Sequence, residues 1–207
     1  HRRGSRAASS ARRAWAECLR PVMSSTSGDV SVGGQNLRHA FAVFAVMTFA
    51  LFIRSLGFEH VFTDEGVVFA PADAPYHMRR AFYTFANFPE LLLRDPYLHF
   101  PGGVNVPWPP LFDFIVGGTA RIFAEDQAGF ERIAAWASSV FGALTVVPIY
   151  FIARQVSSHA VGLFAGFLFS LFPMCVKYGR VGNPDHHTAV ALVGACMLLL
   201  CTYVALT

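Results

Sequence analysis

The sequence has few charged residues and few cysteines for its length. Of 207 residues, 14% are Asp, Glu, Lys or Arg, and four are cysteine, with no CxxC spacing. The low charge argues against an ordinary soluble domain, and the cysteine spacing argues against a disulfide framework. The rest is largely apolar: 54% of the residues are hydrophobic, 21 are phenylalanine, and the mean hydropathy is +0.44. This composition predicts an integral membrane protein, with no nucleic-acid partner.

The first 38 residues lack a long apolar run. Six arginines lie among the first 22 residues, mixed with Ala and Ser. We expect residues 1–38 to form a disordered basic segment, with Met23 as the translation start. No signal-peptide cleavage site is recognisable, so the first apolar stretch is predicted to be a retained anchor. The positive-inside rule then places the N-terminus in the cytoplasm.

Four apolar stretches are predicted to cross a bilayer as helices, each of which needs roughly 20 residues. Three of them contain no charged residue, namely residues 133–153, 160–176 and 188–206. The first, residues 40–58, contains only Arg54, close enough to its end to reach the interface. The prediction is therefore an all-α membrane domain over residues 39–207, with four transmembrane helices and a first outer loop over residues 59–132.

A fifth apolar stretch, residues 109–124, decides the topology. It contains Asp113 and Arg121 and is only about 16 residues long, shorter than a span requires. We predict that it lies along the membrane or re-enters it. If residues 109–124 do not cross the membrane, an even number of crossings separates Asp73 from Asp185. Both aspartates then face the same, outer side of the membrane.

Asp73 stands just before a stretch with apolar residues at helical spacing. A helix cap is the plain interpretation of such an aspartate, and a metal ligand at the membrane surface is the functional one. His77 and Arg80 follow four and seven residues later, so all three side chains can share one side of a helix. An anionic ligand or a metal-bound phosphate would suit this group.

The second polar cluster is Asp185, His186 and His187, directly before the last apolar run. In an extended backbone Asp185 and His187 point to the same side and can bind one divalent cation. Together with Asp73 they predict a Mn²⁺ or Mg²⁺ site at the outer surface. Such a cation would hold a pyrophosphate leaving group, which favours a polyprenyl-diphosphate sugar donor as substrate.

Other polar residues of the outer loop carry weaker signals. Asp64 and Glu65 form an acidic pair that could supply a general base, although a solvated loop is the plainer interpretation. Neither His99 nor Asp113 shows a periodicity that assigns it a catalytic role.

Four segments resemble the catalytic subunit of oligosaccharyltransferase, a GT-C glycosyltransferase. They are "ADAPYHMRRAF" at residues 72–82, "DPYLHFPGGVNVPWPPLFD" at 95–113, "FERIAAWASSVFGALTVVPIYFIARQV" at 130–156 and "GNPDHH" at 182–187. They occur in the family's order and cover most of the chain from about residue 39. The resemblance also implies two helices lying along the membrane in the first outer loop, in agreement with the crossing argument.

The resemblance implies metal-dependent transfer of an oligosaccharide from a lipid diphosphate carrier to Asn in an Asn-x-Ser/Thr acceptor. By position, Asp73 corresponds to the family's catalytic, metal-binding aspartate, and Asp185 and His187 to its second metal-binding motif. His77, Arg80 and His186 are expected to contact substrate. The Asp-His-His form is similar to archaeal and some bacterial members, which implies a prokaryotic plasma membrane and a site on its extracytoplasmic face.

The chain departs from the family pattern in two local positions and in length. Pro75 replaces a second aromatic, and Val190 stands where a glutamate is frequent. The family has about thirteen spans, a later outer loop with another acidic ligand, and a C-terminal domain with a Trp-Trp-Asp motif. The expectation is therefore an N-terminal fragment that lacks activity by itself.

Two alternatives remain open at this stage. One is another GT-C transferase that uses a lipid monophosphate sugar, such as an O-mannosyl or aminoarabinose transferase, with Asp64 and Glu65 as its acidic pair. The other is a non-catalytic membrane scaffold in which Asp73 and Asp185 only cap helices.

Overall fold

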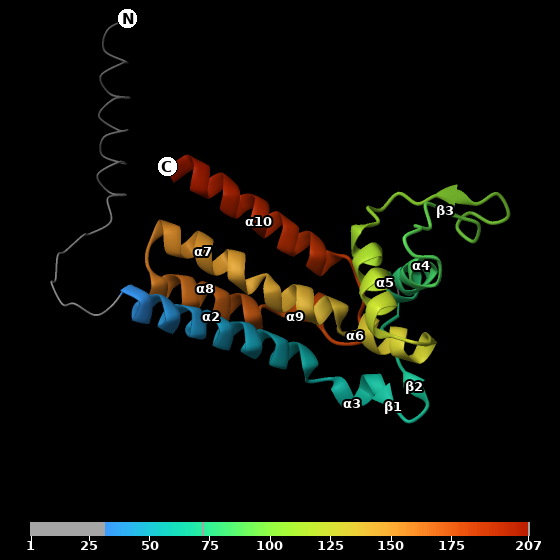
Figure 1. Ribbon diagram of the computed structural model, residues 1–207, viewed down its shortest axis with the longest axis horizontal. Coiled ribbons are helices and arrows are strands. Elements are labelled where there is room, and N and C mark those ends of the chain that lie inside the picture. The colour runs from blue at the N-terminus through green and yellow to red at the C-terminus, as the bar shows by residue number, and fades with distance from the viewer. Residues whose placement is uncertain (1–31, 72, 207) are drawn as a thin grey trace, which may run out of the picture.

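The computed structural model describes residues 32–71 and 73–206, so most of the predicted disordered segment lies outside the described residues. Long helices run side by side over most of the length of the molecule, and short helices and hairpins gather at one end (Figure 1). We call the long helices the bundle and residues 58–123 the head. The predicted helical class is confirmed.

The first bundle helix, α2 (Val32–Ser55), begins before residue 40, where the first span was predicted to start. The next rod consists of α6 (Gln127–Leu144) and α7 (Val146–Val156), which meet at Thr145. Proline has no backbone N–H, so Pro148 cannot bond the carbonyl of Leu144, four residues earlier. This missing bond accounts for the interruption at Thr145, whose hydroxyl donates to the Phe141 carbonyl at 2.8 Å.

The third apolar stretch does not form one straight helix. It divides into α8 (His159–Leu171) and α9 (Pro173–Gly179), which are bent by 62°. Pro173 disfavours a helical conformation at Phe172 and is well suited to the first turn of a new helix, so the chain bends between them. The last helix, α10 (His187–Leu206), matches the predicted span within one residue at its start.

Three helices in the described part of the chain are long and apolar enough to cross a membrane: Gly34–Ser55, Gln127–Val156 and His187–Leu206. The bent pair α8 and α9 makes a fourth if it is taken as one span. Consecutive members alternate in direction, so that α2 ends, α6 begins and α10 begins at the end of the bundle that carries the head (Figure 1).

The head begins with the short helix α3 (Phe58–Val61) and an antiparallel hairpin of β1 (Phe62–Thr63) and β2 (Gly66–Val67). Helix α4 (Asp73–Asn87) follows. A second antiparallel hairpin, β3 (Arg94–Asp95) with β4 (Val104–Asn105), connects it to α5 (Leu111–Phe123). At 1.5 Å per residue α5 is about 20 Å long, too short for a hydrocarbon core of about 30 Å.

Helices α4 and α5 pack on each other and on the first part of α6 around one apolar core. Its buried residues include Phe85 of α4, Phe112 and Val116 of α5, and Phe130 of α6. Each helix turns an apolar side toward this core. The core therefore fixes α4 relative to α6, whose residues in turn support the loop before α10.

Gly117 sets the distance between α4 and α5. A Cβ at this position would lie 2.5 Å from the carbonyl oxygen of Ala81 and 2.8 Å from Thr84 Cβ, so a helix backbone would have to move. We expect Gly117→Ala to lower the free energy of unfolding by about 1–3 kcal/mol, measured by denaturation in detergent. Gly194→Ala is the control, because a Cβ there meets nothing within 4 Å. Equal stability of the two variants would contradict the close packing.

The loop between α9 and α10 is held against both the bundle and the head. The N–H of Val181 donates to the Arg54 carbonyl and that of Gly182 to the Ala135 carbonyl, both at 2.9 Å. Gly182 has a φ of 76°, a conformation that favours glycine, and a Cβ there would lie 2.6 Å from a side-chain atom of α3. These contacts bring Asp185 to the junction of head and bundle.

Candidate functional site

Asp185 is anchored through its backbone to helix α6. Its N–H donates to the Ser138 hydroxyl oxygen at 2.9 Å. The same hydroxyl donates to the Asp185 carbonyl oxygen at 3.0 Å. The carboxylate also accepts from the backbone N–H of His187 at 3.3 Å, as expected near a helix start. Only 3% of Asp185 is exposed. The carboxylate is therefore fixed in position, and its capping bond does not preclude a second role.

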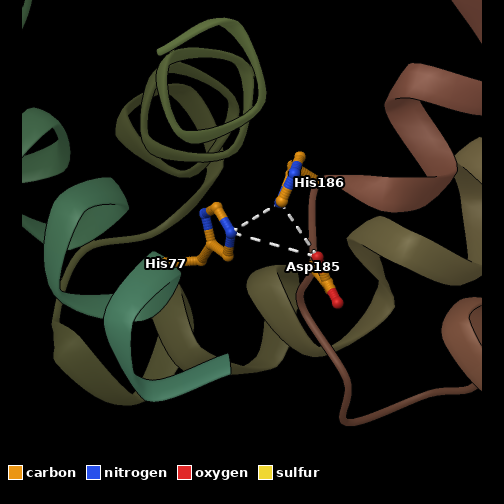
Figure 2. A group of neighbouring side chains, drawn as sticks. All are labelled: His77, Asp185 and His186. Carbon is orange, nitrogen blue, oxygen red and sulfur yellow. Dashed lines mark hydrogen bonds and ion pairs between the residues drawn. The ribbon is translucent and has the colours of Figure 1, made fainter. Parts of the chain in front are cut away.

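Three imidazoles surround one oxygen of this carboxylate. Asp185 Oδ1 lies 2.6 Å from His187 Nδ1, 3.1 Å from His186 Nδ1 and 3.9 Å from His77 Nε2. The first two histidines adjoin Asp185 in sequence, whereas His77 reaches it from α4 (Figure 2). His77, from the first polar cluster of the sequence, therefore lies beside the second cluster around Asp185.

On the side of its ring away from Asp185, His77 contacts a buried ion pair between Asp113 and Arg80. Its Nδ1 lies 2.7 Å from Asp113 Oδ1, and Arg80 Nη1 lies 2.8 Å from Asp113 Oδ2. All three side chains are at most 2% exposed. His77 and Arg80 come from α4 and Asp113 from α5, so the packing of the two helices assembles this group. The opposite edge of the His77 ring, Nε2, lies 2.9 Å from His186 Nδ1.

Asp113 was missed by the sequence interpretation, which used it only as an argument against a span. The signal that could have found it is a single carboxylate in an apolar helix, because such a group is seldom buried without a partner. His77 and Arg80, three residues apart on one helix side, were the available partners. Sequence spacing gave no reason to choose Asp113 over other acidic residues of the loop.

Asp73 is the first residue of α4 and is exposed, one helical turn before His77. Among the residues that the structure describes, it has no hydrogen bond or ion pair with the Asp185 cluster. Its place on the same helix side as His77 agrees with the predicted arrangement, and its role as a ligand stays a prediction.

The donor atoms near Asp185 fit a divalent cation. One ligand atom each from His77, Asp185 and His186 lie within 4.8 Å of one another. Burial, followed by the nearby His77, lowers the pKa of His186, which favours the neutral imidazole that binds metals. One carboxylate with imidazoles suits a transition ion such as Mn²⁺ better than Mg²⁺, which prefers oxygen ligands.

Asp64 and Glu65 lie apart from this cluster in the described contacts. They form the turn between β1 and β2, and both side chains are exposed. The acidic pair of the alternative transferase therefore has a solvated position in this structure.

Comparison with known proteins identifies relatives of this chain. Residues 107–206 match the family described as dolichyl-phosphate-mannose-protein mannosyltransferase. Dolichyl-phosphooligosaccharide-protein glycotransferase 1 of Archaeoglobus fulgidus is 31% identical over 166 residues, which are 75% of this chain and 26% of that protein. Dolichyl-monophosphooligosaccharide–protein glycotransferase AglB of Haloferax volcanii is 29% identical over 154 residues, 72% of this chain and 15% of that protein.

Solved structures share the fold. The Archaeoglobus fulgidus oligosaccharyltransferase bound to an inhibitory peptide and a dolichol-phosphate has a TM-score of 0.71 and 23% identity, over 80% of this chain and 19% of that one. An Archaeoglobus fulgidus oligosaccharyltransferase in complex with zinc and sulfate has a TM-score of 0.71 and 24% identity, over 76% of this chain and 20% of that one.

The chain thus spans about a quarter or less of the length of these relatives. Within that part, the sequence relatives and the fold agree, and the chain belongs to the family of archaeal-type oligosaccharyltransferases.

Proposed function

We propose that the protein containing this chain transfers an oligosaccharide from a lipid-linked carrier to the Asn of an Asn-x-Ser/Thr acceptor. The observation that carries the proposal is the convergence of His77 with Asp185 and His187 at the junction of head and bundle. The names of the relatives support the reaction class. A diphosphate carrier was predicted from sequence, and the Haloferax relative's name specifies a monophosphate, so the proposal extends only to a phosphate-linked donor.

The proposed cofactor is a divalent cation, Mn²⁺ or Mg²⁺, with Asp185 as its central ligand and His187 and Asp73 as two further ligands. His77, Arg80 and His186 are proposed to contact or orient the substrate phosphate. When bound, the cation would supply a positive charge that stabilises the leaving phosphate oxygen. The contribution of this chain is to fix the ligands, since Asp185 is buried and bonded to Ser138.

For the membrane, we propose four spans: α2, the rod of α6 and α7, the bent pair α8 and α9, and α10. The alternating directions of these elements and the short length of α5 support a head on one side of the membrane. The basic segment before α2 favours the cytoplasm for the N-terminus, which puts the head and the site on the extracytoplasmic face of a prokaryotic plasma membrane.

The test is glycan transfer by the full-length protein, supplied with Mn²⁺, lipid-linked oligosaccharide and an Asn-x-Thr peptide. We expect Asp185→Ala and His187→Ala each to lower the transfer rate by roughly 100-fold or more, because each removes a proposed ligand of the cation. Asp64→Ala is the control and is expected to retain activity. The opposite pattern, loss with Asp64→Ala and activity with Asp185→Ala, would favour the monophosphate-sugar transferase.

A further inference from the structure

We propose that Asp113 is a positioning residue of the candidate metal centre. It fixes His77 in one tautomer, so that Nε2 of His77 faces Asp185 as an additional nitrogen ligand. This inference rests on the proposed binding of a divalent cation at Asp185, and it adds His77, through Asp113, to the groups that bind this cation.

The tautomer follows from hydrogen-bond chemistry. An ionised carboxylate only accepts hydrogen bonds, so the contact of 2.7 Å between His77 Nδ1 and Asp113 Oδ1 places the proton on Nδ1. The other carboxylate oxygen lies 2.8 Å from Arg80 Nη1, which balances the negative charge. In the neutral ring, Nε2 therefore carries the lone pair that a metal ion needs.

The free edge of this ring points at the cluster. His77 Nε2 lies 2.9 Å from His186 Nδ1 and 3.9 Å from Asp185 Oδ1, and the side chains converge from separate segments of the chain (Figure 2). A histidine that binds a metal usually donates its other N–H to a carboxylate or a carbonyl, which fixes the ring and raises its basicity. Asp113, His77 and a cation beside Asp185 would form this arrangement.

Asp113 and Arg80, which hold His77, are both buried. Only the packing of α5 on α4 brings Asp113 to the other two residues. Asp113 is 1% exposed, and among the described residues its carboxylate is paired with His77 and Arg80. The close approach at Gly117, one turn along α5, sets its distance from α4. If Asp113 served only stability, its partner His77 would not need to present its other ring nitrogen, Nε2, to a group of metal-ligand atoms.

Asp113→Asn tests the inference because it reverses the tautomer with little change in size. Arg80 still requires an acceptor, so the amide oxygen of Asn would face Arg80 and its NH₂ group would face His77 Nδ1. His77 Nδ1 then accepts, the proton moves to Nε2, and the lone pair toward Asp185 is lost. A wrong tautomer of this kind is known to disable a histidine in a catalytic triad.

The measurement is Mn²⁺ binding, with Mn²⁺ alone, to the full-length protein in detergent, followed by electron paramagnetic resonance. We expect Asp113→Asn to weaken Mn²⁺ binding by about 10–100-fold. Nitrogen NMR of labelled histidine should show the proton of His77 moving from Nδ1 to Nε2. Asp95→Asn is the matched control: Asp95 is also buried and paired with an arginine, Arg79, but contacts no histidine of the site, so Mn²⁺ affinity should be unchanged.

A second variant covers the case in which Asp113→Asn fails to fold. His77→Gln can still donate to Asp113 but has no ligand nitrogen, and it should remove one coupled nitrogen from the pulsed resonance spectrum of bound Mn²⁺. Equal Mn²⁺ binding by the parent protein and Asp185→Ala would overturn the cation site and this inference together. A second outcome would overturn this inference alone. In it, Mn²⁺ binding depends on Asp185, but neither Asp113→Asn nor His77→Gln changes the affinity or the nitrogen coupling.

Discussion

Arg80→Met is expected to lower the free energy of unfolding by about 3–5 kcal/mol. Arg80 and Asp113 are 2% and 1% exposed, with 2.8 Å between Nη1 and Oδ2. Removing the guanidinium leaves the Asp113 carboxylate buried with only His77 as a partner, and an uncompensated buried charge is costly. Methionine keeps much of the length and apolar character of the arginine stem. The loss would be measured by denaturation of the protein in detergent, followed by intrinsic fluorescence.

Two further variants separate charge from packing. Arg121→Met, on the exposed side of α5, should change the stability by less than about 0.5 kcal/mol. Arg80→Met combined with Asp113→Leu removes both charges and should recover much of the loss, because apolar replacement of a whole buried pair is often neutral. A double variant as unstable as Arg80→Met would mean that the unpaired carboxylate is not the cause.

Phe130→Ala is expected to cost about 3–5 kcal/mol of stability. Phe130 is 1% exposed, and its ring centroid lies 5.2 Å from that of Phe82 and 5.4 Å from that of Phe85. Alanine would leave a cavity between α4 and the start of α6. Because α4 carries His77 and α6 carries Ser138, the same variant should also weaken Mn²⁺ binding at the proposed site. Denaturation and Mn²⁺ titration on one sample would measure both effects.

Phe123→Ala is the matched control for this substitution. Phe123 ends α5 and is 74% exposed, so its removal should leave stability nearly unchanged in detergent. If Phe130→Ala and Phe123→Ala were equally stable, the apolar core shared by α4, α5 and α6 would not hold the head on the bundle.

Much of the bundle could be predicted from the sequence, because a long run of apolar residues without charge has few structural solutions in a membrane. The run at residues 188–206 became α10 almost unchanged. The run at residues 160–176 was less well predicted, since length and hydropathy do not reveal a bend. The bend depends on Pro173, whose local effect outweighs the uniform apolar character of the segment.

The candidate site, like the bundle, could be predicted from the sequence only in part. The sequence by itself determined the apolar spans, the two polar clusters around Asp73 and Asp185, and the carboxylate and imidazole chemistry that they offer. Only the tertiary structure decided that His77, from α4, meets Asp185, and that Asp113 holds it in place. The physical reason is that side-chain chemistry and helical periodicity are local properties. The contact between His77 and Asp113 depends instead on how closely α4 and α5 pack at Gly117 and on the core around Phe130.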